Sequence, residues 1–354
     1  MKGKEKPILV VGTLGYQTNK LDGQTVKTRN IVRLLKAKYC GEIKVIDTLY
    51  FKQNIVVNTM RMLYNLLRCK TVIMIPASNS FNVLLPLLYI LSKVFRFHII
   101  LLCVGGWQME FFNGSSKYKA HPYHLKICKK IKAFMPEIDN VTIELVEKYG
   151  FRNCETFTNF RIVDSHQEIE DDLQQRQQLR LVFMARIHKL KGYDIIFTFA
   201  RLIKELNLDI CIDFYGPIND DDESDFKSKA RDYEGIVNYN GVLQPEEINH
   251  TLSNYDILLL PTRYFTEGVP GTIIDAYAAR VPVIVTNWKH AKEVVINGVS
   301  GIIVDFNEPQ EEFNEVIIKL YNDRLLLNKM KQGTSIGLKP YSAETAWMKL
   351  EKYL

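Results

Sequence analysis

Residues 257–286 read ILLLPTRYFTEGVPGTIIDAYAARVPVIVT. The stretch opens on the apolar run 257–260 and closes on the run 283–286, and both have the composition of strands buried on two faces. A loop rich in glycine and proline lies between the runs and leads into a helix that begins near Thr272. Two buried strands joined by a helix make a β-α-β unit, so this stretch predicts a parallel sheet.

The same alternation extends along the whole chain. Strands are expected at residues 7–11, 43–46, 71–75, 98–104, 181–185, 210–215, 236–239, 257–260, 283–286 and 301–304. The segments between them repeat apolar residues at helical spacing, and the expected helices include 83–94, 192–206, 245–253 and 311–321. A polar stretch at 165–178 divides the two series and is interpreted as a linker or a solvated helix. The sequence therefore predicts an α/β fold of two doubly wound, Rossmann-like domains joined near residue 165.

Composition agrees with a protein that has large buried cores. Of 354 residues, 47% are hydrophobic, and neither glycine nor proline is in excess, which excludes disorder and collagen. The six cysteines lack Cys-x-x-Cys or Cys/His spacing, so we expect no zinc site and reduced thiols in a cytosolic protein. The apolar run 8–11 is too short for a signal-peptide core, and 84–91 is too short to span a membrane.

Several common catalytic motifs are missing. No G-x-G-x-x-G follows the first strand, because Gly12 and Gly15 have the wrong spacing, and this disfavours a dehydrogenase. The chain also lacks G-x-x-x-x-G-K-[ST] and G-x-S-x-G, which argues against a P-loop NTPase and an α/β-hydrolase.

The loop after residues 257–260 carries the first candidate site. Its glycines let backbone amides approach a ligand closely, and the unpaired amides of the following helix N-terminus suit a phosphate. Glu267 lies in this loop, and Asp275 lies about one turn into the helix, where its carboxylate can accept hydrogen bonds from ribose hydroxyls. Taken singly, Glu267 is also compatible with an ordinary loop residue, and Asp275 with a favourable helix-dipole contact.

A second candidate lies in the turn after residues 181–185. Arg186 and Lys191 flank a strand-to-helix turn at the carboxyl edge of the sheet, where two cations suit a diphosphate. Gly192 permits the backbone conformations that a tight turn needs. An ordinary exposed basic turn has the same composition. The acidic run 219–223 mimics an Asp-x-Asp metal motif, but like charges in a row stay solvated, and we interpret it as a surface loop.

Taken together, these segments resemble the retaining family 4 glycosyltransferases of GT-B fold. The resemblance rests on Arg186 with Lys191-Gly192, on Y-G-P at 215–217, G-V-L at 241–243, E-G-V-P-G-T-I-I-D at 267–275, A-x-x-x-P-V-I-V-T at 279–286 and N-G-V-S-G-I-I-V at 297–304. The first half matches more loosely, through D-G-Q at 22–24 and G-G-W at 105–107. Asp275 stands where the family usually has glutamate, and Gly105-Gly106 stands where many members have a histidine. His121 and His124 follow at a distance and are expected to be surface or core residues.

The resemblance implies roles for named residues. Arg186, Lys191 and Glu267 would be catalytic, the two cations on the diphosphate and Glu267 on the donor sugar. Donor binding would fall to Gly216, Val242, Gly268, Val269, Pro270, Gly271, Thr272 and Asp275. Gly23, Gly105 and Gly106 would line the acceptor side of a cleft between domains 1–165 and 166–340. The final helix, in 341–354, would pack back on the first domain.

The implied activity is transfer of a sugar from a UDP- or GDP-linked donor to a hydroxyl of a lipid-linked saccharide, with retention, in building a capsule or O-antigen. No metal or cofactor is expected. A catalytically silent relative acting as a scaffold and a nucleotide-sugar epimerase remain as alternatives.

Charge is distributed unevenly along the chain. Residues 1–165 hold 25 Lys and Arg against 11 Asp and Glu, a net of +14, whereas residues 166–354 hold 21 against 29, a net of −8. Uneven surface composition without a partner is one explanation, and an anionic partner of the first half is another. Two basic runs expected on helices are Lys27, Arg29, Arg33, Lys36 and Lys38, and Lys126, Lys129, Lys130 and Lys132. Since no nucleic-acid-binding module accompanies them, they favour peripheral association with the anionic inner face of the plasma membrane.

Overall fold

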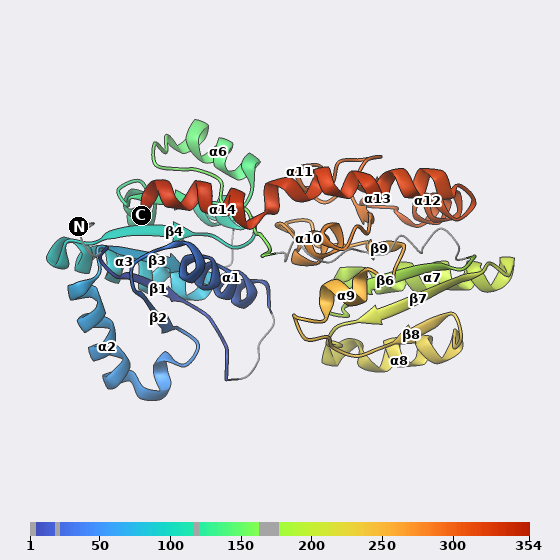
Figure 1. Cartoon of the computed structure of the whole chain (residues 1–354), viewed down its shortest axis with the longest axis horizontal. Helices are drawn as coiled ribbons and strands as arrows, with labels where there is room; N and C mark the ends of the chain where they lie inside the picture. The colour runs from blue at the N-terminus through green and yellow to red at the C-terminus, as the bar shows by residue number, and fades with distance from the viewer. Residues whose placement is uncertain (1–4, 18–21, 116–119, 163–176) are drawn as a thin grey trace. The chain divides into compact units, whose positions relative to one another are not determined.

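The computed structural model describes residues 5–17, 22–115, 120–162 and 177–354, with residues 78 and 79 described in backbone only. The chain forms two compact units (Figure 1). The first unit comprises residues 1–162 and 341–354, and the second comprises residues 163–340. The predicted linker or solvated helix at 165–178 lies almost wholly outside the described residues.

Within the described residues, the first unit contains a five-stranded parallel sheet in the order β2-β1-β3-β4-β5. The strands are β1 (Ile8–Gly12), β2 (Ile43–Asp47), β3 (Thr71–Ile75), β4 (His98–Leu102) and β5 (Ala133–Met135). β1 and β3 are buried at every position, as expected for central strands covered by helices on both faces. β4 ends at Leu102 rather than Val104, because the glycine loop at 105–106 already begins to turn the chain.

The helices of the first unit cover both faces of this sheet. They are α1 (Gly23–Lys38), α2 (Ile55–Arg68), α3 (Ser78–Phe95), α4 (Gln108–Phe112), α5 (Pro122–Cys128) and α6 (Asp139–Tyr149), with a 3-10 turn, η1, at Phe51–Asn54. Crossovers between parallel strands are right-handed. The connection through α1 runs one way along the sheet, and those through α2 and α3 run the other way. Therefore α1 lies on one face, and α2 and α3 share the opposite face.

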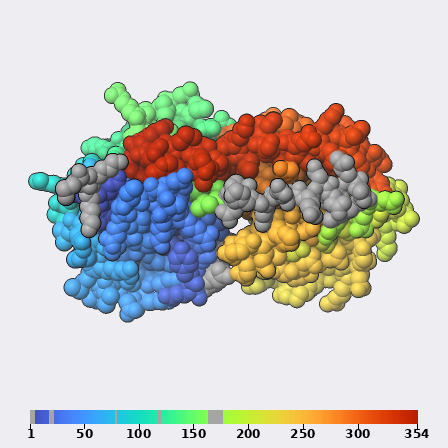
Figure 2. Space-filling model, viewed as in Figure 1, coloured from blue at the N-terminus to red at the C-terminus, as the bar shows by residue number. Residues whose placement is uncertain are grey.

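The C-terminal residues belong to the first unit. The 3-10 turn η5 (Lys339–Tyr341) precedes α14 (Ala343–Leu350), and the turn η6 (Glu351–Tyr353) follows it. Ser342 caps α14 by accepting a hydrogen bond from the Thr345 amide at 3.1 Å. In the space-filling view, the red C-terminal residues lie against the blue N-terminal ones (Figure 2).

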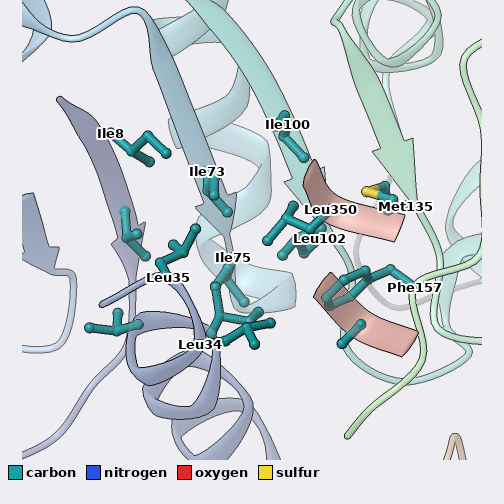
Figure 3. Packing of buried hydrophobic residues seen from close by; sticks show 14 of the residues in the cluster. Ile8, Leu34, Leu35, Ile73, Ile75, Ile100, Leu102, Met135, Phe157 and Leu350 are labelled. Carbon is teal, nitrogen blue, oxygen red and sulfur yellow. The ribbon is translucent and has the colours of Figure 1, made fainter. Parts of the chain in front are cut away.

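A buried cluster joins α14 to the sheet. Leu34 and Leu35 of α1, Ile75 of β3 and Leu350 of α14 all point into it and are at most 1% exposed (Figure 3). Phe157, from the segment that follows α6, closes the same cluster. Burying such side chains stabilises each by about 1.5–3 kcal/mol, so the C-terminal helix is part of the core of the first unit.

The end of the chain also makes a polar contact with the first unit. Burial alone raises the pKa of Glu155, but hydrogen bonds from Lys352 Nζ at 2.8 Å and the Tyr353 hydroxyl at 2.7 Å outweigh it and lower that pKa below 4.5. A lowered carboxyl pKa contributes stability above pH 4.5 that is lost as the pH falls through the folded-state value. The free energy of unfolding should therefore fall between neutral pH and pH values below 4.5. We expect this fall to be smaller in Tyr353→Phe than in the wild type, by under about 1 kcal/mol. Urea unfolding of wild type and variant across this range measures it, and parallel pH profiles would contradict the assignment.

The second unit contains, within the described residues, a six-stranded parallel sheet in the order β11-β10-β9-β6-β7-β8. Its strands are β6 (Leu179–Met184), β7 (Ile210–Tyr215), β8 (Val237–Tyr239), β9 (Ile257–Leu260), β10 (Val283–Thr286) and β11 (Gly301–Val304). The chain builds outward from β6 to β8, then returns to the other side of β6 and builds outward from β9 to β11. The strand order therefore reverses between β6 and β9, which is the topological switch point where ligands bind in such sheets.

The helices of the second unit follow the strands in alternation. They are α7 (Tyr193–Leu206), α8 (Glu223–Asp232), α9 (Ile248–Leu252), α10 (Gly271–Ala278), α11 (Ala291–Val294), α12 (Gln310–Asn322) and α13 (Arg324–Leu338), with 3-10 turns η3 (Lys189–Lys191) and η4 (Asp220–Asp222). None of the helices in the described part of the chain is both long and apolar enough to cross a bilayer. The six cysteines, all in described residues, are free thiols.

The interpretation of residues 219–223 as a solvated loop holds for the exposed Asp220, Asp221 and Glu223, but it is wrong for Asp222 and for the secondary structure. This run forms η4 and the start of α8, where acidic side chains interact favourably with the helix N-terminus. Asp222 is only 4% exposed and accepts a hydrogen bond from the Tyr193 hydroxyl at 3.3 Å. The same hydroxyl also donates to Asp225 at 2.7 Å, so part of the acidic run anchors α8 to α7.

Candidate functional site

The candidate residues of the second unit lie at one edge of its sheet. Arg186 and Lys191 follow β6, Gly216 follows β7, Val242 follows β8, and Glu267 follows β9. All four strands are parallel, so these loops leave the same carboxyl edge. The loops after β6 and β9 flank the switch point itself, which makes them the positions where a ligand is expected.

Backbone contacts hold these two loops together. Gly192 has a φ of +79°, and a Cβ at this position would lie 1.9 Å from the Pro261 carbonyl oxygen. The Leu190 carbonyl accepts hydrogen bonds from the Arg263 amide at 2.8 Å and the Thr262 hydroxyl at 3.2 Å. Only glycine allows this approach, and the approach brings the end of η3 against the start of the β9 loop.

We expect Gly192→Ala to separate the two loops. Besides the cost of a left-handed conformation, the added methyl group collides with backbone rather than with a movable side chain, and this overpacking costs about 1–3 kcal/mol. Gly298→Ala is the matched control, because Gly298 has a φ of +76° and open space around its Cβ position. The melting temperatures of the two variants measure the difference, and equal losses would show that the close approach is unimportant.

An ion pair forms where the two loops meet. Lys191 Nζ donates a hydrogen bond to Glu267 Oε2, and the two side chains are 25% and 17% exposed. The sequence predicts both residues in one site, and the structure brings their charged atoms into contact. Because the pair is only partly buried, both groups remain accessible to a ligand at the edge of the sheet.

The N-terminus of α10 lies next to Glu267 in the chain. Gly268, Val269 and Pro270 are buried and lead directly into the helix, which begins at Gly271. Pro270 makes no side-chain cap, and the Thr272 hydroxyl is buried without a hydrogen-bond partner in the described residues. A helix N-terminus with an unused hydroxyl, shortly after the glutamate that contacts a lysine, offers hydrogen-bond donors to an anion.

The remaining donor-side candidates lie around this centre. Asp275 is half-buried within α10, one turn beyond its start. Gly216 has a φ of +132°, and a Cβ there would lie 2.0 Å from the Ala185 carbonyl oxygen, so it packs directly beside the backbone of Arg186. The Arg186 side chain is exposed and makes no hydrogen bond or ion pair with the described residues. Val242 is exposed and lies farther from the switch point, where its neighbour Gly241 accepts a hydrogen bond from the Gly216 amide at 2.8 Å.

The first unit has a buried charge pair that the sequence pattern does not predict. Lys27 of α1 is fully buried, and its Nζ donates to the carbonyl oxygens of Cys103 at 2.9 Å and Phe157 at 3.2 Å. It lies 3.8 Å from Oε2 of Glu137, which is itself 2% exposed. Burial lowers the pKa of Lys27, although the nearby carboxylate opposes this shift.

Glu137 also holds the predicted acceptor-side loop. Its Oε2 accepts a hydrogen bond of 2.5 Å from the amide of Gly105, which has a φ of +77°. Gly106 is buried, and the indole of Trp107 donates to the Val104 carbonyl at 2.9 Å. The predicted loop is therefore fixed by a carboxylate that follows β5. A charged residue two positions after the buried run 133–135 is the signal that reveals it.

Gly23 and the two histidines play smaller parts in this unit. Gly23 is the first residue of α1 and is exposed, with open space where a side chain would lie. His121 is exposed, whereas His124 is fully buried among Phe81 and Phe111. Burial lowers the pKa of His124, which suits a neutral core residue as expected.

The predicted basic helix faces need correction. Lys27 and Arg29 do not face solvent, because Arg29 is 8% exposed and donates to the carbonyl oxygens of Leu14 at 2.7 Å and Gly15 at 2.9 Å. The second run is not helical throughout, since α5 ends at Cys128 and leaves only Lys126 of that run on the helix.

An open hollow of about 720 Å³ lies elsewhere in the second unit. It is lined by residues at the amino ends of β6, β7 and β8, including Arg180, Asp209 and Asn238. This is the edge opposite to Lys191 and Glu267. Because ligands of doubly wound sheets bind at the carboxyl edge, we assign the site to the switch point and not to this hollow.

The second unit resembles a known protein family. Residues 165–335 match the family model described as Glycosyl transferases group 1. This match covers most of the second unit, including every candidate residue from Arg186 to Asp275.

Two curated proteins are similar to part of this chain. Over 207 residues the chain is 24% identical to the capsular polysaccharide biosynthesis glycosyltransferase CapM of Staphylococcus aureus, covering 57% of this chain and 53% of CapM. Over 143 residues it is 27% identical to an uncharacterized 41.2 kDa protein in the cps region of Klebsiella pneumoniae, covering 40% of this chain and 36% of that protein. The chain thus matches about half or less of the length of these relatives.

A solved structure resembles the whole chain. The crystal structure of Anabaena Alr3699/HepE in complex with UDP and glucose aligns with a TM-score of 0.70 at 13% identity, covering 98% of this chain and 99% of that one. At this identity the likeness shows the fold alone. It confirms the predicted fold class, two Rossmann-like α/β domains of the GT-B type.

Proposed function

We propose that the chain is a retaining glycosyltransferase that moves a sugar from a nucleoside-diphosphate sugar to a hydroxyl of a saccharide acceptor in cell-surface polysaccharide synthesis. The observation that carries the proposal is the contact between Lys191 and Glu267 at the switch point, beside the N-terminus of α10. HepE was solved with UDP and glucose, and CapM is named for capsular polysaccharide biosynthesis, which supports this class of substrate.

The diphosphate of the donor would bind at the cationic part of this site. Lys191, together with the first amides and the Thr272 hydroxyl of α10, supplies donors for its oxygens, and the exposed Arg186 supplies a second cation. Glu267 would accept hydrogen bonds from the sugar hydroxyls, and Asp275 from the ribose. When the diphosphate binds, the Lys191 ammonium exchanges part of its contact with Glu267 for the phosphate.

The reaction breaks the bond between the anomeric carbon and the diphosphate oxygen, and forms a bond to the acceptor oxygen on the same face. The acceptor proton passes to the departing diphosphate. Negative charge therefore grows on the leaving group, and fixed cations and amide dipoles stabilise that charge without reorganising. No protein nucleophile is required by this path.

The acceptor would bind to the first unit, at the loop of Gly105 and Gly106 that Glu137 holds. A lipid-linked saccharide at an anionic membrane surface is the acceptor class we propose, because the first half of the chain has a net charge of +14 (25 − 11). Gly23, at the start of α1, belongs to the same carboxyl edge of the first sheet.

Thermal unfolding of the full chain with UDP, GDP and their sugars tests donor binding. A ligand that binds only the native state raises the melting temperature, and we expect one nucleotide series to do so. Donor consumption with and without a lipid-linked acceptor then distinguishes transfer, which needs the acceptor, from an epimerase, which does not. A scaffold protein would consume no donor in either arm.

We expect transfer to continue in EDTA, because the proposed charge stabilisation comes from Arg186, Lys191 and the amides of α10 rather than from a divalent cation. Activity after chelation, compared with samples resupplied with manganese or magnesium, measures this. Strict dependence on the added metal would contradict the proposed mechanism.

A further inference from the structure

Helix α2 exposes an apolar stripe. Val56, Met60, Tyr64 and Leu67 recur at intervals of four, four and three residues, so they share one side of the helix, and each is more than half exposed. Met62 and Leu66 on the other side are buried against the first unit. The helix is therefore apolar on its solvent side as well as on its buried side.

Helix α3 repeats this arrangement. Val83, Leu87, Ile90 and Val94 recur at intervals of four, three and four residues. Three of them are more than half exposed and Leu87 is 41% exposed, whereas Leu85 and Leu88 are fully buried. Two separate helices thus each present an exposed apolar stripe, with residues three or four positions apart.

Both stripes belong to one side of the first unit. The right-handed crossover rule places α2 and α3 on the same face of the sheet, opposite α1 and α14. Figure 1 shows the two helices in the first unit, and α2 forms part of the molecular surface in Figure 2. Exposed apolar residues gathered in this way mark an interaction site rather than ordinary surface variation. We call the eight stripe residues and the basic residues around them the α2–α3 surface.

The sequence span that contains these stripes carries charge of one sign. No Asp or Glu occurs between Asp47 and Glu110, a span that includes all of α2 and α3. The same span contains six exposed cationic side chains: Lys52, Arg61, Arg68, Lys70, Lys93 and Arg96. The guanidinium of Arg68 stacks on the ring of Tyr64 at 5.3 Å, so the apolar and cationic groups are interleaved.

We propose that the α2–α3 surface docks the protein on an anionic lipid bilayer. Apolar side chains flanked by lysine and arginine, without acidic residues, match the boundary between acyl chains and anionic headgroups. A second copy of the chain fits less well, because a twofold contact through this surface would oppose the same cations. The proposal concerns a different surface from the proposed donor site, so lipid binding can be measured without turnover.

Flotation of the full chain with vesicles tests this surface. Phosphatidylcholine vesicles with phosphatidylglycerol are compared with vesicles of phosphatidylcholine alone, at low and at high salt. We expect the wild type to float with the anionic vesicles and to be released by salt, since the cationic contribution is screened. Met60→Glu combined with Ile90→Glu is expected to lower the bound fraction at least roughly tenfold, because each change removes an apolar contact and adds repulsion.

Leu325→Glu is the matched control, because Leu325 is 76% exposed on the second unit and lies outside the α2–α3 surface. It should float like the wild type. All variants should keep the melting temperature and nucleotide response of the wild type, which shows that folding and donor binding are intact. A wild type that stays unbound at low salt, or equal binding by the Met60/Ile90 variant, would overturn the proposal.

Sedimentation in the absence of lipid tests whether a second copy of the chain binds to the α2–α3 surface instead. A concentration-dependent dimer that the Met60/Ile90 variant abolishes would assign the α2–α3 surface to a second copy and overturn the membrane assignment. A monomer under these conditions, together with flotation, supports it. If no nucleotide stabilises the wild type while flotation succeeds, the proposed transferase activity fails and the lipid-binding surface stands.

Discussion

Replacing Lys191 with alanine is expected to lower the rate of sugar transfer by roughly 10²-fold or more, the loss typical of removing one preorganised donor at a developing charge. Lys191 is the cation that the structure brings into contact with Glu267 beside α10. The charge on the leaving diphosphate is larger in the transition state than in the bound donor. The loss should therefore appear mainly in kcat, with a smaller change in the KM for the donor.

Lys189→Ala is the control for Lys191→Ala. Lys189 lies two residues earlier in the same 3-10 turn, and its side chain is exposed. Its loss removes a similar charge from the surface and should leave kcat within a factor of a few. Initial rates of nucleotide release, with circular dichroism to verify folding, compare the two variants. Near-wild-type kcat in folded Lys191→Ala would remove Lys191 from the mechanism.

Much of the fold is readable from the sequence because most strands are buried. β3, β7, β9, β10 and β11 have the predicted bounds, since strands covered on both faces appear as largely apolar runs between polar or glycine-containing turns. β5 was not predicted, because its three residues are too few to form a pattern.

Helix α13 was missed for a different reason. Gly333 and Gly337 lie within it, and glycine normally disfavours a helix interior. A Cβ at Gly333 would lie 2.2 Å from the Val299 carbonyl oxygen, and one at Gly337 would lie 2.9 Å from the Tyr277 ring. These glycines allow a close tertiary approach, and such contacts between distant segments leave no local signal in the sequence.

The candidate site was partly predictable because buried parallel strands can be recognised in the sequence. Parallel strands bring their following loops to one edge, so Lys191 and Glu267 were placed together from order and spacing. The direction in which a side chain points is harder to predict. Lys27 was counted as part of a solvent-facing stripe, although its spacing to Ile31 and Leu34, four and seven residues on, places it on the buried side of α1.

That buried lysine leads to the largest stability effect that we expect. Lys27→Met should destabilise the first unit by about 3–5 kcal/mol, because it leaves the carboxylate of Glu137 buried without its cation. Methionine fills much of the volume of the lysine stem, so lost charge pairing rather than a cavity dominates the change. Lys36→Met, on the exposed side of the same helix, should change stability by no more than about 0.5 kcal/mol.

A double-mutant cycle separates the charge pair from general packing. Glu137→Gln alone leaves Lys27 buried without its counter-ion, and the combination Lys27→Met/Glu137→Gln removes both charges. We expect the double variant to be more stable than the sum of the single losses predicts, because the neutral pair carries no uncompensated charge. Urea unfolding of the four proteins at neutral pH measures the coupling. Strictly additive losses would mean that Lys27 stabilises the unit through its carbonyl contacts with Cys103 and Phe157, and that Glu137 acts only on the Gly105 loop.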